Sequence, residues 1–162
     1  MKIGVNLLPA KVSSSSCPGH MCVWWCQGTT TIFRGFHFSP SDLPVKFRDV
    51  TKWREYLFDH AVHGYVQNDL FMRDWAEEHA ASMLHKTWNV PQPQGSMLAL
   101  RCTPGPQGRY SFNPDDHPGA FNCVTWAAER LNEAAGSVLP KVRQGRIKLM
   151  AAVLKSHETS DP

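Results

Sequence analysis

The clearest helix signal in the chain begins at Asn122, and it places a cysteine in the first turn of that helix. Asn122 is a favourable N-cap residue, and Gly136 followed by Pro140 predicts where the helix ends. The apolar residues that recur at helical spacing are Val124, Ala127, Ala128, Leu131 and Ala135. A helix N-terminus carries roughly half a positive charge, which favours a thiolate over a thiol. The sequence therefore predicts an activated thiol at Cys123, with a buried structural cysteine as the alternative.

The composition predicts one domain and limits the kinds of partner. The chain has 162 residues, of which 42% are hydrophobic, enough for one domain over 1–162 with a single sizeable core, before a disordered tail at 157–162. The net charge of +3 comes from scattered lysines and arginines, so we expect no nucleic-acid partner. Five cysteines, an odd number, predict synthesis in a reducing compartment. No apolar stretch is long enough for a signal peptide or a transmembrane segment.

Strand signals come first along the chain and helix signals follow. The predicted elements are a strand over 2–8, a hairpin of strands over 21–26 and 30–38, a helix from Asp49 or Thr51 to Ala61, a short strand at 65–66, a helix from Asn68 or Asp69 to Lys86, a linker over 88–95, a strand over 97–102 and a helix over 141–156. Together with the helix at Asn122, this order predicts an α+β fold in which a small antiparallel β-sheet packs against helices.

A nucleophilic cysteine needs an imidazole within hydrogen-bond reach and a third group that orients the imidazole. Six of the eight histidines have ordinary positions in helices, loops or the tail: His60, His63, His79, His85, His117 and His157. His20 instead opens the first hairpin strand, and His37 lies near the end of the second. Both can flank one end of the same sheet face, where a packed helix N-terminus would complete a cluster of Cys123, His20 and His37.

Three ordered landmarks carry a family resemblance. They are Gly19-His20 opening a strand, Gly35-Phe36-His37-Phe38-Ser39-Pro40 closing the hairpin, and Asn122-Cys123-Val124-Thr125-Trp126 at a helix start. Their order resembles that of the circularly permuted papain-like hydrolases, the NlpC-type proteins that include relatives of lecithin:retinol acyltransferase. The resemblance implies a permuted papain-like fold with the nucleophile at a helix N-terminus. It is closest to small bacterial domains found as type VI secretion effectors or fused to their delivery proteins.

The resemblance also implies a role for each landmark residue. Cys123 would attack a carbonyl to form an acyl-enzyme, with His20 as the general base and the backbone N–H of Cys123 as an oxyanion donor. His37 would orient the imidazole. The hairpin is one residue longer than the subgroup's usual Gly-Phe-x-x-Pro, which leaves Ser39, Asp42 or a backbone carbonyl as alternatives for this role. We expect the reaction to need neither a cofactor nor a metal.

The substrate class is predicted less directly. Trp24, Phe36 and Trp126 are candidate substrate-binding residues, although aromatic residues of the hairpin can equally fill the core. An apolar groove and a mild positive charge favour phospholipid acyl esters over peptidoglycan peptide amides. As an effector toxin, the protein would be made in the bacterial cytoplasm without a signal peptide. It would then be carried by a secretion delivery protein to the periplasm of a target cell, and a cognate immunity protein would block it.

Two alternatives make the protein a binding module instead of an enzyme. Four potential zinc ligands lie within ten residues: Cys17, His20, Cys22 and Cys26. Their spacing differs from the usual paired zinc knuckles, and alternate residues of one strand project to the same face. The second alternative is a papain-like domain that has lost catalysis and only recognises a partner.

Overall fold

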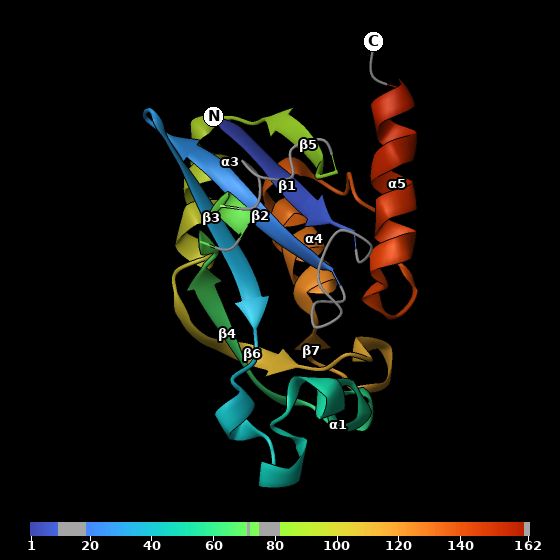
Figure 1. Cartoon of the computed structure of the whole chain (residues 1–162). Coiled ribbons are helices and arrows are strands. Elements are labelled where there is room, and N and C mark those ends of the chain that lie inside the picture. The colour runs from blue at the N-terminus through green and yellow to red at the C-terminus, as the bar shows by residue number, and fades with distance from the viewer. Residues whose placement is uncertain (10–18, 71, 75–81, 161–162) are drawn as a thin grey trace.

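A seven-stranded sheet forms the framework of the protein, with the strand order β5-β1-β2-β3-β4-β6-β7 (Figure 1). The computed structural model describes residues 1–9, 19–70, 72–74 and 82–160. The strands are β1 (Lys2–Leu8), β2 (His20–Gln27), β3 (Thr30–His37), β4 (Val62–Asn68), β5 (Leu84–Asn89), β6 (Gly105–Tyr110) and β7 (Ala120–Phe121). Neighbouring strands are antiparallel except for β6 and β7, which pair in parallel. The predicted α+β class is confirmed, whereas the permuted papain-like arrangement stays a prediction.

Helices cover the sheet and connect its strands. They are α1 (Trp53–Asp59), α3 (Gln92–Arg101), α4 (Cys123–Ala135) and α5 (Ile147–Ser160), with short 3₁₀ helices η1 (Pro40–Asp42), η2 (Val45–Phe47), η3 (Val50–Lys52), η4 (Pro114–Asp116) and η5 (Arg143–Gly145). The helix α4 crosses one face of the sheet at β2 and β3, α3 packs against α4, and α5 lies beside β5 (Figure 1). None of the helices that the described residues form has the length and apolar character to cross a membrane.

Strand β2 is buried on both of its faces. Met21, Val23 and Trp25 point into the main core, which they share with α4, while Cys22 packs in a smaller cluster with Leu8 on the opposite face. Successive side chains of a strand point to opposite faces, so a run of apolar residues is what a strand covered on both sides requires. The predicted hairpin is confirmed as β2 and β3, and α4 begins at the predicted cysteine.

The predicted helix start at Asn68 or Asp69 is confirmed, since the backbone is helical at Leu70 and over 72–74, but three predictions between there and Cys102 are wrong. Residues 84–89 form β5, not the end of a helix, because they pair with β1 at the edge of the sheet. The predicted linker over 88–95 contains the start of α3, since proline is tolerated in a first helical turn. The predicted strand over 97–102 is the rest of α3, whose Leu98 is buried in the main core. Here tertiary packing overrides local propensity.

Smaller differences occur near the C-terminus. The predicted helix over 141–156 is the 3₁₀ helix η5 followed by α5. The helix α5 runs to Ser160, so helical backbone extends into the predicted tail at 157–162. Residues 161–162, and Cys17 and His79 elsewhere in the chain, lie outside the described residues.

Candidate active site

Cys123 is the first residue of α4, and Asn122 caps the helix in front of it. The Oδ1 atom of Asn122 accepts hydrogen bonds from the N–H groups of Val124 and Thr125, both at 3.0 Å. The N–H of Trp126 donates to the carbonyl of Asn122 at 3.1 Å. Among the described hydrogen bonds, none uses the N–H of Cys123. The cap therefore leaves the N–H of Cys123 available in the first turn, and this N–H is the predicted oxyanion donor.

The cap is itself held from the loop that precedes α5. The Nδ2 atom of Asn122 donates to the carbonyls of Gln144, at 3.0 Å, and Gly145, at 3.2 Å. Both loop residues have left-handed backbones, with φ of 54° and 56°. A Cβ atom on Gly145 would lie 2.6 Å from the Nδ2 of Asn122, which is closer than real contacts allow. The loop thus fixes the amide with its oxygen toward α4.

His20 lies between the thiol and a carboxylate. Its Nε2 is 2.6 Å from the Oδ2 of Asp69, and the Cys123 side chain is near enough to raise the pKa of His20. Since Nε2 faces Asp69, the other ring nitrogen, Nδ1, points away from the carboxylate. His20 and Cys123 are only 7% and 8% exposed. The three side chains form a buried Cys–His–Asp cluster.

Asp69 is fixed by its position directly after β4. Its N–H donates to the carbonyl of Phe33 at 3.0 Å, and its Oδ1 accepts from the N–H of Met72 at 3.1 Å. The backbone is helical at Leu70 and over 72–74, so the carboxylate caps a helix with one oxygen and faces His20 with the other. Because its side chain is 1% exposed, solvent competes little for either contact.

The charges of this cluster stabilise one another. Burial alone would lower the pKa of His20, but the charges of Asp69 and Cys123 outweigh it and raise that pKa well above its usual value. Burial would raise the pKa of Asp69, yet His20 and His37 hold it well below the usual range. The favoured state is an imidazolium paired with a carboxylate.

His37 completes the cluster from the end of β3. Its ring stacks on that of His20, with centroids 4.7 Å apart and planes inclined by 30°. Its Nε2 lies 3.7 Å from the Oδ2 of Asp69, which is too long for a hydrogen bond. Burial lowers the pKa of His37, and neighbouring His20 adds to this. With its side chain 31% exposed, His37 is the edge of the cluster that solvent reaches.

The close approach of these groups requires a glycine on β3. A Cβ atom on Gly35 would collide with the Oδ2 of Asp69 and lie 2.8 Å from the Nε2 of His37. It would also lie 3.1 Å from the Nε2 of His20. Gly35 therefore makes room for the contact between the carboxylate and both imidazoles.

The structure brings the predicted Cys123, His20 and His37 together, and it adds Asp69. Sequence reasoning treated Asp69 only as a helix start, although an aspartate directly after a strand that neighbours the hairpin was an available signal. The carboxylate of Asp69 contacts the His20 ring nitrogen directly, which is the place that the sequence predicted for His37 as the orienting residue. The alternatives lie elsewhere: Ser39 hydrogen-bonds Ser41, and Asp42 accepts a hydrogen bond from the hydroxyl of Tyr65.

The candidate substrate-binding aromatics lie in packed positions. Phe36 and Trp126 are fully buried and stack on each other with ring centroids 5.6 Å apart. Trp24 is 8% exposed, and its Nε1 donates to the Oδ1 of Asn6 at 2.9 Å. These side chains support the sheet and α4 instead of presenting a groove, because strand and helix faces that meet in a core must be filled.

The zinc ligands proposed from the sequence do not converge. Cys26 lies six residues from His20 along β2, which is roughly 20 Å at the rise of an extended strand. Cys22 is fully buried in the smaller apolar cluster, and Cys17 is outside the described residues. Among the described residues, the group with metal-ligand geometry is His20, His37 and Asp69.

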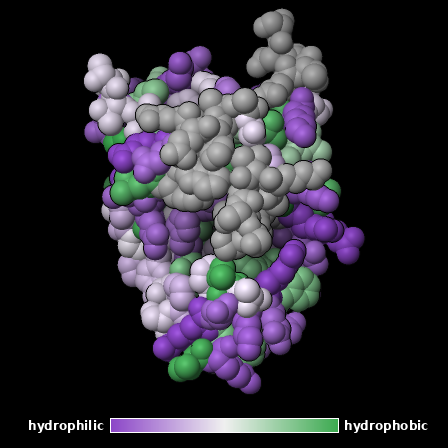
Figure 2. All heavy atoms as spheres, in the orientation of Figure 1, coloured by the Kyte–Doolittle hydropathy of each residue, from purple (hydrophilic) through white to green (hydrophobic). Residues whose placement is uncertain are grey.

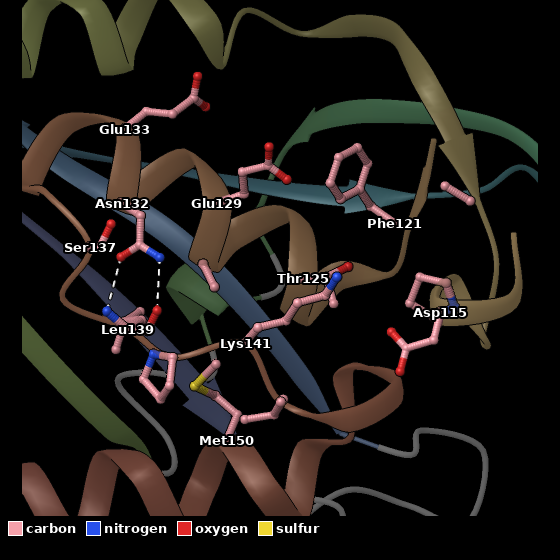
Figure 3. Close-up of a pocket in the computed structure, with 15 residues that line it drawn as sticks. Asp115, Phe121, Thr125, Glu129, Asn132, Glu133, Ser137, Leu139, Lys141 and Met150 are labelled. Atoms are coloured by element: carbon pink, nitrogen blue, oxygen red, sulfur yellow. Dashed lines mark hydrogen bonds between the residues drawn. The ribbon is translucent and has the colours of Figure 1, made fainter. Parts of the chain in front are cut away.

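A pocket of about 420 Å³ lies on the opposite face of α4 (Figure 3). Glu129, Asn132 and Glu133 line it from α4, and Lys141 and Met150 face them from the following segment and from α5. The side chain of Asn132 is engaged in hydrogen bonds to the backbone of Leu139, drawn as dashed lines in Figure 3. None of the Cys–His–Asp cluster lines this pocket.

Comparisons of the chain with models of protein families, with curated protein sequences and with solved structures found no match. The described features define an α+β protein with a buried Cys–His–Asp cluster at a helix N-terminus. The resemblance to permuted papain-like hydrolases remains a prediction from the ordered motifs.

Proposed function

We propose that this protein is a cysteine hydrolase in which Cys123 attacks the carbonyl of an ester or amide. The observation that carries the proposal is the position of buried His20, which is hydrogen-bonded to Asp69 and near enough to Cys123 for that side chain to raise its pKa. A thiol at a helix N-terminus, an imidazole beside it and a buried carboxylate behind the imidazole together supply a nucleophile, a base and an orienting group.

The side chains of the cluster have different roles in the reaction. His20 takes the proton of the Cys123 thiol and becomes the imidazolium that Asp69 stabilises; the thiolate sulfur then bonds to the carbonyl carbon, and the N–H of Cys123 stabilises the oxyanion. His20 then gives its proton to the leaving alcohol or amine as the bond to the carbonyl carbon breaks. Water deprotonated by His20 cleaves the thioester, which releases the acid and restores the thiol. Asp69 accepts the hydrogen bond from Nε2, so that Nδ1 is the nitrogen that exchanges protons with the thiol.

His37 acts as a positioning residue. Its stacked ring limits rotation of the His20 imidazole on the face that would otherwise be open. It lies too far from Asp69 for a hydrogen bond, so it positions the His20 ring mainly by stacking on it. Replacing the His37 ring should disturb the geometry of proton transfer at His20, while the nucleophile Cys123 stays in place.

The resemblance names the first substrate to test, a phospholipid acyl ester, and the second, a peptidoglycan amide. Burial of Phe36 and Trp126 removes them as walls of an acyl groove. On the face shown in Figure 2, hydrophobic residues form small separate patches between hydrophilic ones. The geometry of the site therefore supports attack on a carbonyl group but does not select the substrate. The lipid substrate, the toxin role, the delivery protein and the immunity protein are predictions of the resemblance.

The proposal is tested by incubating the protein separately with phospholipid vesicles and with purified sacculi and analysing the products by mass spectrometry. We expect one substrate to be cleaved by the wild type and by Cys26→Ala, and neither by Cys123→Ala. Cys26 is a matched control because its thiol is more exposed than Cys123 but lies at the far end of β2. The melting temperature of Cys123→Ala should stay close to that of the wild type.

Three outcomes would count against parts of this proposal. Turnover by Cys123→Ala equal to that of the wild type would remove the nucleophile. Release of muropeptides with intact lipids would replace the ester by the amide. Wild-type protein that leaves both substrates unchanged would favour the alternative of an interaction module.

A further inference from the structure

Three metal-ligating atoms converge on the outer side of the His20 ring. They come from His20, His37 and Asp69, whose ligand atoms lie within 4.8 Å of one another; the Nε2 atoms of both histidines face the Oδ2 of Asp69. Each comes from a different part of the sheet: the start of β2, the end of β3 and the residue after β4. Two imidazole nitrogens and one carboxylate oxygen are a donor set typical of zinc.

The spacing of these atoms is close to what a tetrahedral ion needs. Bonds of about 2.0–2.1 Å at tetrahedral angles put donor atoms roughly 3.3 Å apart. The observed distances to the Oδ2 of Asp69 lie on either side of this value, at 2.6 Å from His20 and 3.7 Å from His37. Binding a zinc ion would therefore change each of these two distances by less than about 1 Å.

The geometry also leaves a path to the cluster and fixes one of its members, Asp69. His37 is 31% exposed, so an ion can approach past its ring. Asp69 is held by hydrogen bonds from its own N–H and to its Oδ1, neither of which uses the Oδ2 that would bind the ion. Gly35 keeps a side chain out of the space between the donors.

The ion and the thiol would occupy opposite sides of one imidazole. The two ring nitrogens of histidine point away from each other, and the one that faces Asp69 is Nε2. A metal ion at this position binds His20 on the side away from Cys123. The nucleophile is therefore not a ligand, although it shares His20 with the ion.

We propose that His20, His37 and Asp69 form a zinc site and that zinc bound there reversibly inhibits the enzyme. The inhibitory effect rests on the proposed function, whereas zinc binding does not. Zinc binds the lone pair of the His20 Nε2, so the single proton of the neutral imidazole lies on Nδ1, and the second proton of an imidazolium passes to solvent. The metal-bound imidazole keeps its proton on Nδ1 and has no lone pair for the thiol proton. Asp69 then binds the ion instead of orienting the ring.

Zinc binding is tested by titrating zinc chloride into the full chain, freed of metal with a chelator, in a calorimeter. We expect one zinc ion per chain in the wild type and in Cys123→Ala. His37→Ala should bind zinc at least about tenfold more weakly, because it loses a ligand. The matched control is His63→Ala, which removes an exposed histidine on β4 and should bind as the wild type does.

A second variant covers the case in which His37→Ala does not fold. Asp69→Asn keeps the shape of the side chain, and it should weaken zinc binding to a similar degree. The inference is overturned if the wild type binds no stoichiometric zinc, or if both variants bind it as tightly as the wild type. It is also overturned if Cys123→Ala abolishes binding, since the ion would then be on the thiol.

Turnover measured with and without one equivalent of zinc separates the inference from the proposed function. We expect zinc to suppress turnover of the wild type and a chelator to restore it. Zinc that binds without changing Cys123-dependent turnover would overturn the inhibition alone. Zinc-free protein with no Cys123-dependent turnover would overturn the hydrolase assignment, while the calorimetric result would still stand.

Discussion

The two faces of α4 differ in what they offer. The face toward the sheet places Cys123 against His20 and Asp69, with all three side chains nearly buried. The opposite face borders a pocket of about 420 Å³ that has carboxylates and an amide but no thiol or imidazole. This pocket thus lies across the helix from the thiol and the imidazoles, whereas a second pocket, of about 220 Å³, is lined in part by Asp69.

This difference shows that volume alone does not locate a reactive site. Residues of a helix advance by about 100° each, so side chains two or five positions after Cys123 point away from it. The two faces are connected at the N-terminus of α4 by Asn122, whose side chain caps the helix and binds the loop before α5. Variants on each face can therefore test whether the distinction holds.

The largest expected effect is on the sheet side, at Asp69. Replacement by asparagine keeps the size of the side chain but removes the charge that stabilises the His20 imidazolium. We expect turnover to fall by about 10²- to 10⁴-fold, as measured in steady-state kinetics. Asp42→Asn, which alters an exposed carboxylate bound to Tyr65, should stay within about twofold of the wild type. Full activity in Asp69→Asn would show that the carboxylate is only a helix cap.

The next largest effect is predicted for Gly35→Ala. The added methyl group would collide with Asp69, so the carboxylate and the imidazoles must separate. We expect a loss of about 1–3 kcal/mol in unfolding free energy, together with reduced turnover. Gly28→Ala is the control: its φ of 65° strains an alanine, but the added methyl group meets open space. It should lose about 1 kcal/mol and keep its turnover; equal turnover in the two variants would contradict the steric argument.

A smaller effect should distinguish the two asparagines of α4. Asn122→Ala removes the cap and should cost about 1 kcal/mol in urea unfolding, with lower turnover because the first turn carries Cys123. Asn132→Ala breaks hydrogen bonds to Val138 and Leu139 on the pocket side and should cost a similar amount. Its turnover should remain near that of the wild type. A loss of turnover in both variants would mean that the two faces of α4 are coupled.

The smallest effect is the pH dependence of stability. The pKa of Asp69 is lower in the folded protein than the value of about 3.9 in the unfolded chain, so Asp69 stabilises the fold at pH values above about 3.9. This stabilisation is lost as the pH falls toward the pKa of the folded state. The pKa of His20 is higher in the folded protein than the value of about 6.5 in the unfolded chain, so His20 stabilises the fold at pH values below about 6.5. This stabilisation is lost as the pH rises through the pKa of the folded state. The unfolding free energy of the wild type should exceed that of Asp69→Asn by the largest amount between about pH 4 and 6.5. The midpoints of urea unfolding at several pH values measure this difference. A difference that does not vary with pH would argue against a charged pair.

Local patterns in the sequence predicted the hairpin and the start of α4 correctly. Each depends on neighbouring residues: a glycine turn between β-favouring runs, and an asparagine cap before an apolar helical repeat. The segment 84–102 was predicted wrongly because its local signals are weak and pairing with β1 and packing on α4 decide its structure. The same limit applied to Asp69, whose role depends on a partner 49 residues away.

The sequence by itself determined which thiol begins a helix and which histidines come before it, since capping and strand alternation act over a few residues. The tertiary structure decided which carboxylate faces His20, because antiparallel pairing of β3 with β4 carries Asp69 to the start of β2. It also decided that Phe36 and Trp126 fill the core and that the pocket lies behind α4. These outcomes depend on how distant segments pack, which no local pattern records.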